Sequence, residues 1–157
     1  MEDQKKEMIR REFLGAAAMS AMTIAAFPAT LRAAEWTAQE RANVQIVTDF
    51  CVAWSTRDIA KPLALLADDC VYRMSETTPP ANGHDGVIQR LKSYVDATDR
   101  LEFKILETQA MGPIVINHRI DSFVSRTRPL TWEGVGVFFV QNGKIKEWSD
   151  YTIRVNR

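Results

Sequence analysis

Leu101-Glu102-Phe103-Lys104-Ile105 is the stretch at which the hydrophobic pattern of this sequence changes its period. Apolar and charged residues alternate there, which is the pattern of a strand with one buried face. Three further segments of strand length follow it: 114–125, 130–140 and 144–155. Gly112-Pro113 marks a turn after the first segment, and Asn142-Gly143 is a strong hairpin signal before the last. The sequence therefore predicts four consecutive antiparallel strands.

The chain ahead of Leu101 has helical spacing instead. Thr37 is a suitable N-cap residue and Glu40 stands three positions later, which predicts a capping box at the start of a helix. The apolar residues after it recur at helical spacing: Val44, Val47, Phe50, Cys51 and Trp54. The other predicted elements are a second helix over 59–67, a strand over 70–74, a loop over 77–83 and a third helix with Asp85 as its N-cap.

Helices that precede an antiparallel meander are typical of the α+β class, in which helices pack on one face of a sheet. We expect the sheet to curl around a helix and to form a cone with a pocket inside. Ligands bind preferentially in concave, largely apolar sites of this kind. The four tryptophans and seven phenylalanines supply bulk for a core or a pocket wall.

The 157 residues are enough for one domain with a full core. Lys and Arg together number 20, as do Asp and Glu, so the formal net charge is zero. This balance gives no electrostatic reason to expect a nucleic-acid partner. Because the sequence has no basic run, we also expect no stable anchoring to a membrane.

The cysteines and histidines do not form a metal-binding motif. We therefore expect no metal site. We also expect His84, near a loop, and His118, on the opposite strand face from Arg119, to lie outside the functional site. The sequence leaves open whether Cys51 and Cys70 form a disulfide, because a disulfide requires both an oxidising compartment and a geometry that sequence does not reveal.

Ile9-Arg10-Arg11-Glu12-Phe13-Leu14 opens a segment that has the order of a secretory signal. Its two arginines precede a mostly apolar stretch, 13–27, and resemble a twin-arginine signal, which directs folded proteins across a bacterial inner membrane. We expect a signal segment over 1–33, a mature domain over 34–157 and a periplasmic or secreted location. The alternatives are a retained helix and a membrane anchor, although the apolar run is shorter than the ~20 residues that a span needs.

Three charged side chains are expected to meet on one face of the predicted sheet. Alternate residues of a strand share a face. This rule places together Asn117, Arg119, Asp121 and Phe123 on one strand, and Trp148, Asp150 and Thr152 on another. A planar guanidinium can bind two carboxylates, and one buried carboxyl group then keeps its proton while the other ionises, as acid–base catalysis requires. Spacing alone fits a solvated strand face with a cross-strand salt bridge at least as well.

Short motifs along the domain stand in the order and spacing of a known family, with a shorter connection near 126–129. They are Pro79-Pro80-Ala81-x-Gly83-x-Asp85-x-Val87, Arg119-x-Asp121, Gly136-Val137-Phe138, Gly143-Lys144-Ile145 and Trp148-x-Asp150-Tyr151. On these residues the chain from about Val44 to Val155 resembles limonene-1,2-epoxide hydrolase and its relatives in the SnoaL-like/NTF2-like superfamily. The resemblance implies an NTF2-like cone of the α+β class, with a curved mixed or antiparallel sheet packed on N-terminal helices, and a homodimer.

The resemblance also implies catalytic roles. Asp150 is expected to deprotonate a water molecule, Asp121 to protonate the epoxide oxygen, and Arg119 to hold both carboxyl groups. A small apolar epoxide and water would give a vicinal diol in one step, without a covalent intermediate or a cofactor. The alternatives are another acid–base enzyme of this fold (an isomerase, dehydratase or cyclase) and a non-catalytic ligand-binding module.

The family holds the water with a tyrosine, which Tyr72 matches, and with an asparagine, whose position is Met74 in this sequence. A thioether cannot supply the hydrogen bonds of an amide, so Asn117 is the candidate substitute for positioning the water. The same alignment gives a substrate-binding wall, whose members are equally well read as core: Cys51, Trp54, Leu91, Phe123 and Trp132.

Overall fold

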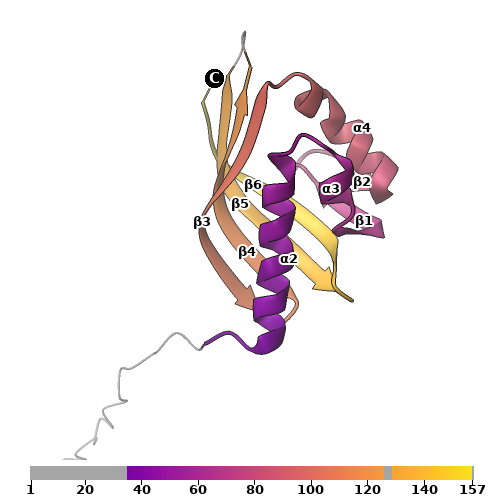
Figure 1. The fold of residues 1–157 in the computed structure, drawn as a ribbon, viewed down its shortest axis with the longest axis vertical. Coiled ribbons are helices and arrows are strands. Elements are labelled where there is room, and N and C mark those ends of the chain that lie inside the picture. The colour runs from indigo at the N-terminus through magenta and orange to yellow at the C-terminus, as the bar shows by residue number, and fades with distance from the viewer. Residues whose placement is uncertain (1–34, 126–128, 157) are drawn as a thin grey trace, which may run out of the picture. The chain divides into compact units, whose positions relative to one another are not determined.

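The computed structural model describes residues 35–125 and 129–156, so the predicted export signal lies outside the described residues. Within them, six strands form one curved sheet, and the helix α2 lies across its concave face (Figure 1). The elements in chain order are α2 (Ala38–Trp54), α3 (Ala60–Leu63), β1 (Leu66–Arg73), β2 (Ala81–Asn82), α4 (Gly83–Asp96), β3 (Arg100–Met111), β4 (Ile114–Val124), β5 (Leu130–Gln141) and β6 (Lys144–Asn156). The predicted α+β class with a curved sheet is confirmed.

The four long strands β3 to β6 pair antiparallel in chain order, as the sequence predicts. Asn142 and Gly143 both have positive φ, at 51° and 74°, which is the geometry of a tight turn that suits twisted strands. The sheet order is β2-β1-β6-β5-β4-β3, and β1 runs parallel to β6. This crossover makes the sheet mixed and sets Tyr72 opposite Trp148.

The predicted capping box begins α2. The backbone N–H of Glu40 donates to Thr37 Oγ1 at 3.2 Å, and the backbone N–H of Thr37 donates to Glu40 Oε2 at 2.7 Å. The helix buries the stripe that contains Val47, Phe50 and Trp54 against the sheet. Phe50 and Trp54 therefore form the floor on which the inner side chains of the strands pack.

The segment after α2 differs from the prediction. The second helix is only four residues long, and β1 begins at Leu66, because Leu66 already pairs with Ile145 of β6. Within the predicted loop 77–83, Ala81–Asn82 forms the short edge strand β2. Asp85 is not an N-cap: α4 begins two residues earlier, at Gly83, and Asp85 lies in its first turn. β1 pairs with β6 and β2 pairs with β1, and local spacing does not encode either pairing.

Cys51 and Cys70 are both buried as free thiols, so the structure contains no disulfide between them. Among residues 35–125 and 129–156, no helix combines the length and the apolar character that a membrane crossing requires.

Candidate active site

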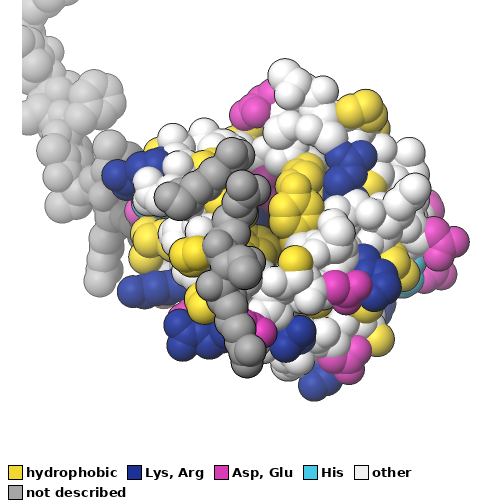
Figure 2. Space-filling view, turned by 90° about the horizontal axis from the view of Figure 1, so that it is seen from above, with side chains coloured by type: hydrophobic (Ala, Val, Ile, Leu, Met, Phe, Trp, Pro, Cys, Tyr) yellow, Lys and Arg dark blue, Asp and Glu magenta, His cyan; other side chains and the backbone are white. Residues whose placement is uncertain are grey.

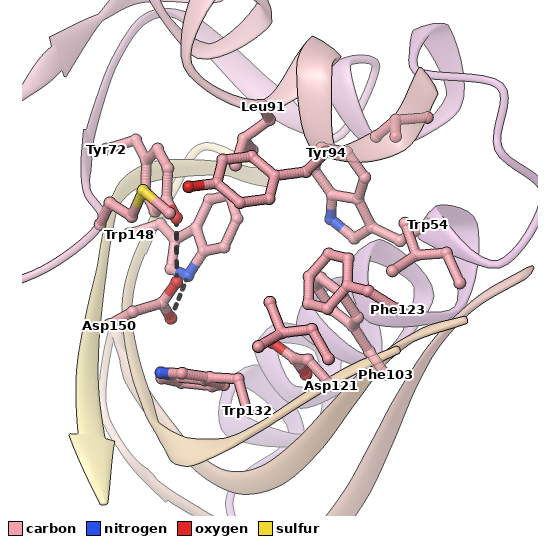
Figure 3. Close-up of a pocket in the computed structure, with 14 residues that line it drawn as sticks. Trp54, Tyr72, Leu91, Tyr94, Phe103, Asp121, Phe123, Trp132, Trp148 and Asp150 are labelled. Atoms are coloured by element: carbon pink, nitrogen blue, oxygen red, sulfur yellow. Dashed lines mark hydrogen bonds between the residues drawn. The ribbon is translucent and has the colours of Figure 1, made fainter. Parts of the chain in front are cut away.

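A pocket lies between the concave face of the sheet and the helices α2 and α4 (Figure 3). Its lining is mostly aromatic and aliphatic, and consists of Trp54, Tyr72, Met74, Leu91, Tyr94, Val95, Leu101, Phe103, Asp121, Phe123, Leu130, Trp132, Trp148 and Asp150. Seen from the end of the molecule that α4 covers, hydrophobic side chains gather near the middle and charged ones near the edge (Figure 2). Two carboxyl groups thus sit in an otherwise apolar wall.

β4 carries the charged centre of this site on its concave side. Asn117, Arg119 and Asp121 alternate with outward side chains and are 0%, 0% and 4% exposed. Gly136, which stands opposite Asn117 on β5, leaves the space that the guanidinium fills. A Cβ atom at Gly136 would lie 2.0 Å from Arg119 Nη1, so any other residue there collides with Arg119 or displaces it.

Arg119 bridges two carboxyl groups. Its Nε donates to Asp121 Oδ1 at 3.0 Å, and its Nη2 donates to Asp150 Oδ1 at 2.7 Å. Its Nη1 donates to Asn117 Oδ1 at 3.1 Å, which fixes the guanidinium from below. The Trp132 ring centroid lies 5.0 Å from the guanidinium carbon, within the range of a cation–π contact. The structure therefore brings together the three charged side chains that strand alternation placed on one face.

The two carboxyl groups differ in the donors that reach them. Asp150 Oδ1 accepts from Arg119 and also from Trp148 Nε1 at 2.7 Å. Asp150 Oδ2 accepts from the Tyr72 hydroxyl at 3.2 Å. Among the described residues, Asp121 accepts a side-chain hydrogen bond from Arg119 Nε alone. Asp150 is therefore better stabilised as an anion than Asp121.

Burial raises the pKa of both carboxyl groups against the opposing effect of Arg119, and the pKa of Asp121 rises to about 7. Fewer donors reach Asp121 than Asp150, so hydrogen bonding favours the ionised form of Asp121 less strongly. Burial works against the charge of Arg119, but Asp150 and Asp121 outweigh it and raise its pKa, so Arg119 stays a cation. Burial and then Asp150 raise the pKa of Tyr72, which stays a neutral donor.

Comparison with known proteins identifies the family. Residues 47–148 match the family model of the SnoaL-like domain. The chain belongs to the SnoaL-like family. A solved structure of an LEH-like epoxide hydrolase from M. tuberculosis is similar, with a TM-score of 0.59 and 26% identity over 72% of this chain and 84% of that one.

Two further structures share the fold of this SnoaL-like domain. A proposed polyketide cyclase from Xanthomonas campestris pv. campestris has a TM-score of 0.63 and 18% identity, over 72% of this chain and 91% of that one. A proposed ketosteroid isomerase from Kribbella flavida has a TM-score of 0.63 and 16% identity, over 76% of this chain and 83% of that one. At these identities the likeness concerns the fold alone.

The SnoaL-like pocket contains Tyr72 and the predicted wall residues Trp54, Leu91, Phe123 and Trp132. Asn117 and Cys51 lie beneath the pocket instead of in its lining. The Asn117 oxygen accepts from Arg119, and its Nδ2 lies 3.6 Å from Cys51 Sγ. Because both ends of this fully buried amide are engaged, Asn117 does not fit the water-positioning role that the sequence suggested. Its contacts are those of a support for Arg119.

Two pocket residues were missed from the sequence as functional groups. Trp148 shares a predicted face with Asp150, but alternation does not show that its N–H donates to that carboxylate. Tyr94 lines the pocket from α4, three residues after Leu91. The i, i+3 spacing from a predicted wall residue was the available signal for Tyr94.

The histidines lie away from the SnoaL-like pocket. His84 Nε2 is 3.4 Å from the carbonyl oxygen of Leu66, and His118 Nε2 is 3.1 Å from Glu133 Oε1 on the convex side of the sheet. In the part of the chain that the structure describes, no three His, Cys, Asp or Glu residues are arranged to hold a metal ion.

Proposed function

We propose that this protein is a cofactor-independent epoxide hydrolase, which adds water to a small apolar epoxide and releases a vicinal diol. The observation that carries the proposal is the Arg119 bridge between Asp121 and Asp150, two buried carboxyl groups that line one apolar pocket. Opening an epoxide requires a base for the water and an acid for the ring oxygen, both within reach of one small ring. The unequal donor sets of the two carboxyl groups supply both protonation states at neutral pH.

In the proposed step, Asp150 takes a proton from water while the water oxygen forms a bond to one epoxide carbon. The bond between that carbon and the ring oxygen breaks, and the oxygen takes the proton of Asp121. The product is a diol that carries one oxygen from water. Asp150 is then protonated and Asp121 is ionised, and a proton transfer between them through solvent restores the starting state. Arg119 remains a cation and holds one carboxylate throughout.

We assign the attacking water to Asp150 Oδ2, because Arg119 and Trp148 both donate to Oδ1. The Tyr72 hydroxyl donates to Oδ2, so its own oxygen is available to accept the second proton of the water. Met74 lines the pocket but offers only a thioether, which is a weak acceptor. The water in this proposal is therefore held by Asp150 and Tyr72 without an amide.

An oxygen-labelling experiment tests the reaction. We expect purified protein, incubated with limonene oxide or cyclohexene oxide in heavy-oxygen water, to produce a diol with one labelled oxygen, detected by mass spectrometry. Epoxide that is consumed without label in the product would overturn hydrolysis. An unreacted epoxide that binds tightly, both to the parent protein and to Asp150→Asn, would identify a ligand-binding module.

Met74 is the observation that favours a second candidate, an isomerisation, dehydration or cyclisation by the same acid and base. An isomerisation or cyclisation moves protons within the substrate, and a dehydration releases a hydroxyl group as water. None of them needs a positioned water, so a thioether at this place in the wall is compatible with them. The labelling experiment separates the two candidates, since only hydrolysis transfers the solvent oxygen to the product.

We also propose that the convex face of the sheet forms the interface of a homodimer. Ile116 is 38% exposed and stands opposite Val137, and Tyr151 is 45% exposed and stands opposite Val135. These side chains make an apolar stripe across β4, β5 and β6, of the kind that marks an interaction surface. We expect sedimentation equilibrium to give a dimer and Tyr151→Asp to shift it to the monomer. A monomeric parent protein would contradict the proposal.

Export is proposed from the sequence, with 1–33 as a twin-arginine signal and 34–157 as the mature domain. We expect Arg10→Lys together with Arg11→Lys to retain the precursor in the cytoplasm when the protein is expressed in a bacterium with this pathway. Unchanged recovery of the double variant from the periplasm would contradict the proposed route.

A further inference from the structure

One buried donor in the pocket wall has no partner. Trp54 Nε1 is the only buried side-chain nitrogen or oxygen without a hydrogen bond among residues 35–125 and 129–156. Trp54 is 2% exposed and belongs to the pocket lining. Buried N–H groups are almost always hydrogen-bonded, because an unpaired one loses its bond to water and gains nothing in return. The missing partner of Trp54 therefore requires an explanation.

Three indoles line the pocket, and the other two have partners. Trp148 Nε1 donates to Asp150 Oδ1 at 2.7 Å, and Trp132 Nε1 donates to Thr152 Oγ1 at 2.9 Å. The rings that pack against Trp54 are those of Phe50, Phe103 and Trp148, at centroid distances of 5.8, 5.8 and 6.2 Å. None of these three side chains carries an oxygen that could accept its N–H, and the described residues supply no other acceptor.

Figure 3 shows Trp54 across the pocket from Tyr72 and Asp150, with the nitrogen-bearing edge of its ring toward the enclosed space. Phe103 and Asp121 lie on the wall between these two ends. A ligand that places its reacting group against the two carboxyl groups thus extends along apolar side chains toward a single hydrogen-bond donor. The pocket has a reactive end and a remote polar point.

We infer that Trp54 Nε1 is a substrate-binding donor, which holds a neutral carbonyl or hydroxyl oxygen at the end of the substrate remote from the epoxide. That the substrate is an epoxide rests on the proposed function; the donor subsite itself does not. The described lining contains no Lys, Arg or His and holds Asp121 and Asp150, so an uncharged oxygen fits better than a carboxylate. The substrate class is an oxygenated apolar epoxide, such as a keto- or hydroxy-epoxide, instead of a pure hydrocarbon epoxide.

An acceptor reaches Trp54 Nε1 only after a wall side chain moves, because the nitrogen itself is buried. Tyr94, on α4, is 38% exposed, and in Figure 3 its ring lies between Trp54 and Tyr72. Its ring packs against that of Phe123, at a centroid distance of 6.2 Å, and an exposed side chain changes rotamer readily. Tyr94 is therefore the wall residue that we expect to give way to the ligand.

Two unreactive ligands test the subsite without any turnover. Limonene and 4-acetyl-1-methylcyclohexene have the same ring and differ in one group, a methylene in the first and a carbonyl oxygen in the second. We expect Trp54→Phe to reduce the preference for the ketone, measured as the ratio of the two Kd values by calorimetry, roughly three- to tenfold. The phenylalanine ring is smaller than the indole, so it weakens the binding of both ligands, and this effect cancels in the ratio of the two Kd values. An unchanged ratio overturns the inference.

Trp132→Phe is the matched control. It removes the same bulk from the same pocket, but the N–H that it removes already donates to Thr152, so the ratio of the two Kd values is expected to stay at the parent value. A ratio that shifts equally in both variants would overturn the assignment to Trp54. If Trp54→Phe does not fold, benzothienylalanine at position 54 keeps the bicyclic shape and replaces the N–H by sulfur, and the same loss of preference is expected.

The 1,2-epoxides of the two ligands connect the subsite to catalysis. We expect Trp54→Phe to change their kcat/KM ratio as it changes the Kd ratio, mainly through KM, because the remote bond forms equally in the ground and transition states. If both epoxides give diols and the ratio of their kcat/KM values is the same in the parent and in Trp54→Phe, hydrolysis is supported and the donor subsite is refuted. If Trp54→Phe shifts the ratio of the two Kd values but neither epoxide gives a diol, the donor subsite is supported and the proposed function is refuted.

Discussion

The two faces of the sheet carry charged clusters that look alike in sequence and differ in chemistry. We call them the inner cluster, Arg119, Asp121 and Asp150, and the outer cluster, His118, Glu133 and Arg154. Each contains an arginine within hydrogen-bond distance of a carboxylate. The inner cluster lies on β4 and β6, and the outer cluster lies on β4, β5 and β6. They differ in solvent access: the Arg119 side chain is 0% exposed and that of Arg154 is 62% exposed.

Solvent access reverses the direction in which the pKa of the carboxyl group shifts. In the inner cluster burial outweighs Arg119 and raises the pKa of Asp121 to about 7. In the outer cluster hydrogen bonds, first from Arg154 and then from His118, lower the pKa of Glu133. The pKa of a carboxyl group beside an arginine is therefore raised on one face of this sheet and lowered on the other. The contrast shows that burial, and not the charge pair, raises the pKa of Asp121.

The largest effect is expected from removing the inner carboxyl groups. Asp121→Asn removes the proposed acid and Asp150→Asn the proposed base, and each is expected to lower kcat by about 10²–10⁴-fold. Circular dichroism should show both variants folded, because asparagine retains the shape and part of the hydrogen bonding. Turnover of an epoxide that survives either substitution would refute the assigned roles.

Strand alternation predicted the inner face of β4 correctly, because the period of two is a local property that follows from backbone geometry. It could not predict that β1 pairs parallel to β6, which brings Tyr72 to Asp150, because such pairing depends on packing of the whole sheet. The place of Tyr72 came from the family resemblance alone. The sequence also made Asn117 the candidate for positioning the water, because strand alternation shows on which face a side chain lies and not how deeply it is buried.

Removing the inner cation is expected to cost stability on the scale of a broken buried ion pair. Arg119→Met leaves two buried carboxyl groups without their shared partner, and we expect a loss of about 3–5 kcal/mol in the free energy of unfolding at pH 7. Urea denaturation measures this loss. Arg154→Met in the outer cluster is the matched control, and no comparable loss is expected there because Arg154 is solvated. Equal losses in both variants would mean that burial does not distinguish the clusters.

The pH dependence of stability should have opposite signs on the two faces. The pKa of Asp121 is raised from the usual 3.8 to about 7, so the folded protein binds more protons than the unfolded chain between these values. The contribution of Asp121 to the free energy of unfolding is present in full below about pH 4. It is lost as the pH rises through about 7, and it is on the order of a few kcal/mol. Asp121→Asn should flatten this decline in urea denaturation between pH 4 and pH 8, and kcat/KM of the parent should fall above about pH 7.

The smallest effect is expected from Glu133→Gln, which makes on the convex face the same carboxyl-to-amide change that Asp121→Asn makes on the concave face. The lowered pKa of Glu133 means that its contribution to stability exists above the pKa of the unfolded chain and disappears as the pH falls through the folded value. Glu133→Gln should therefore leave the decline toward pH 7 intact, and kcat should stay within about twofold of the parent, as for most surface changes. The measurement is the same pair of urea and turnover profiles. If Glu133→Gln flattened the decline near pH 7, the acidic group with the raised pKa would lie on the outer face, and the distinction between the two clusters would fail.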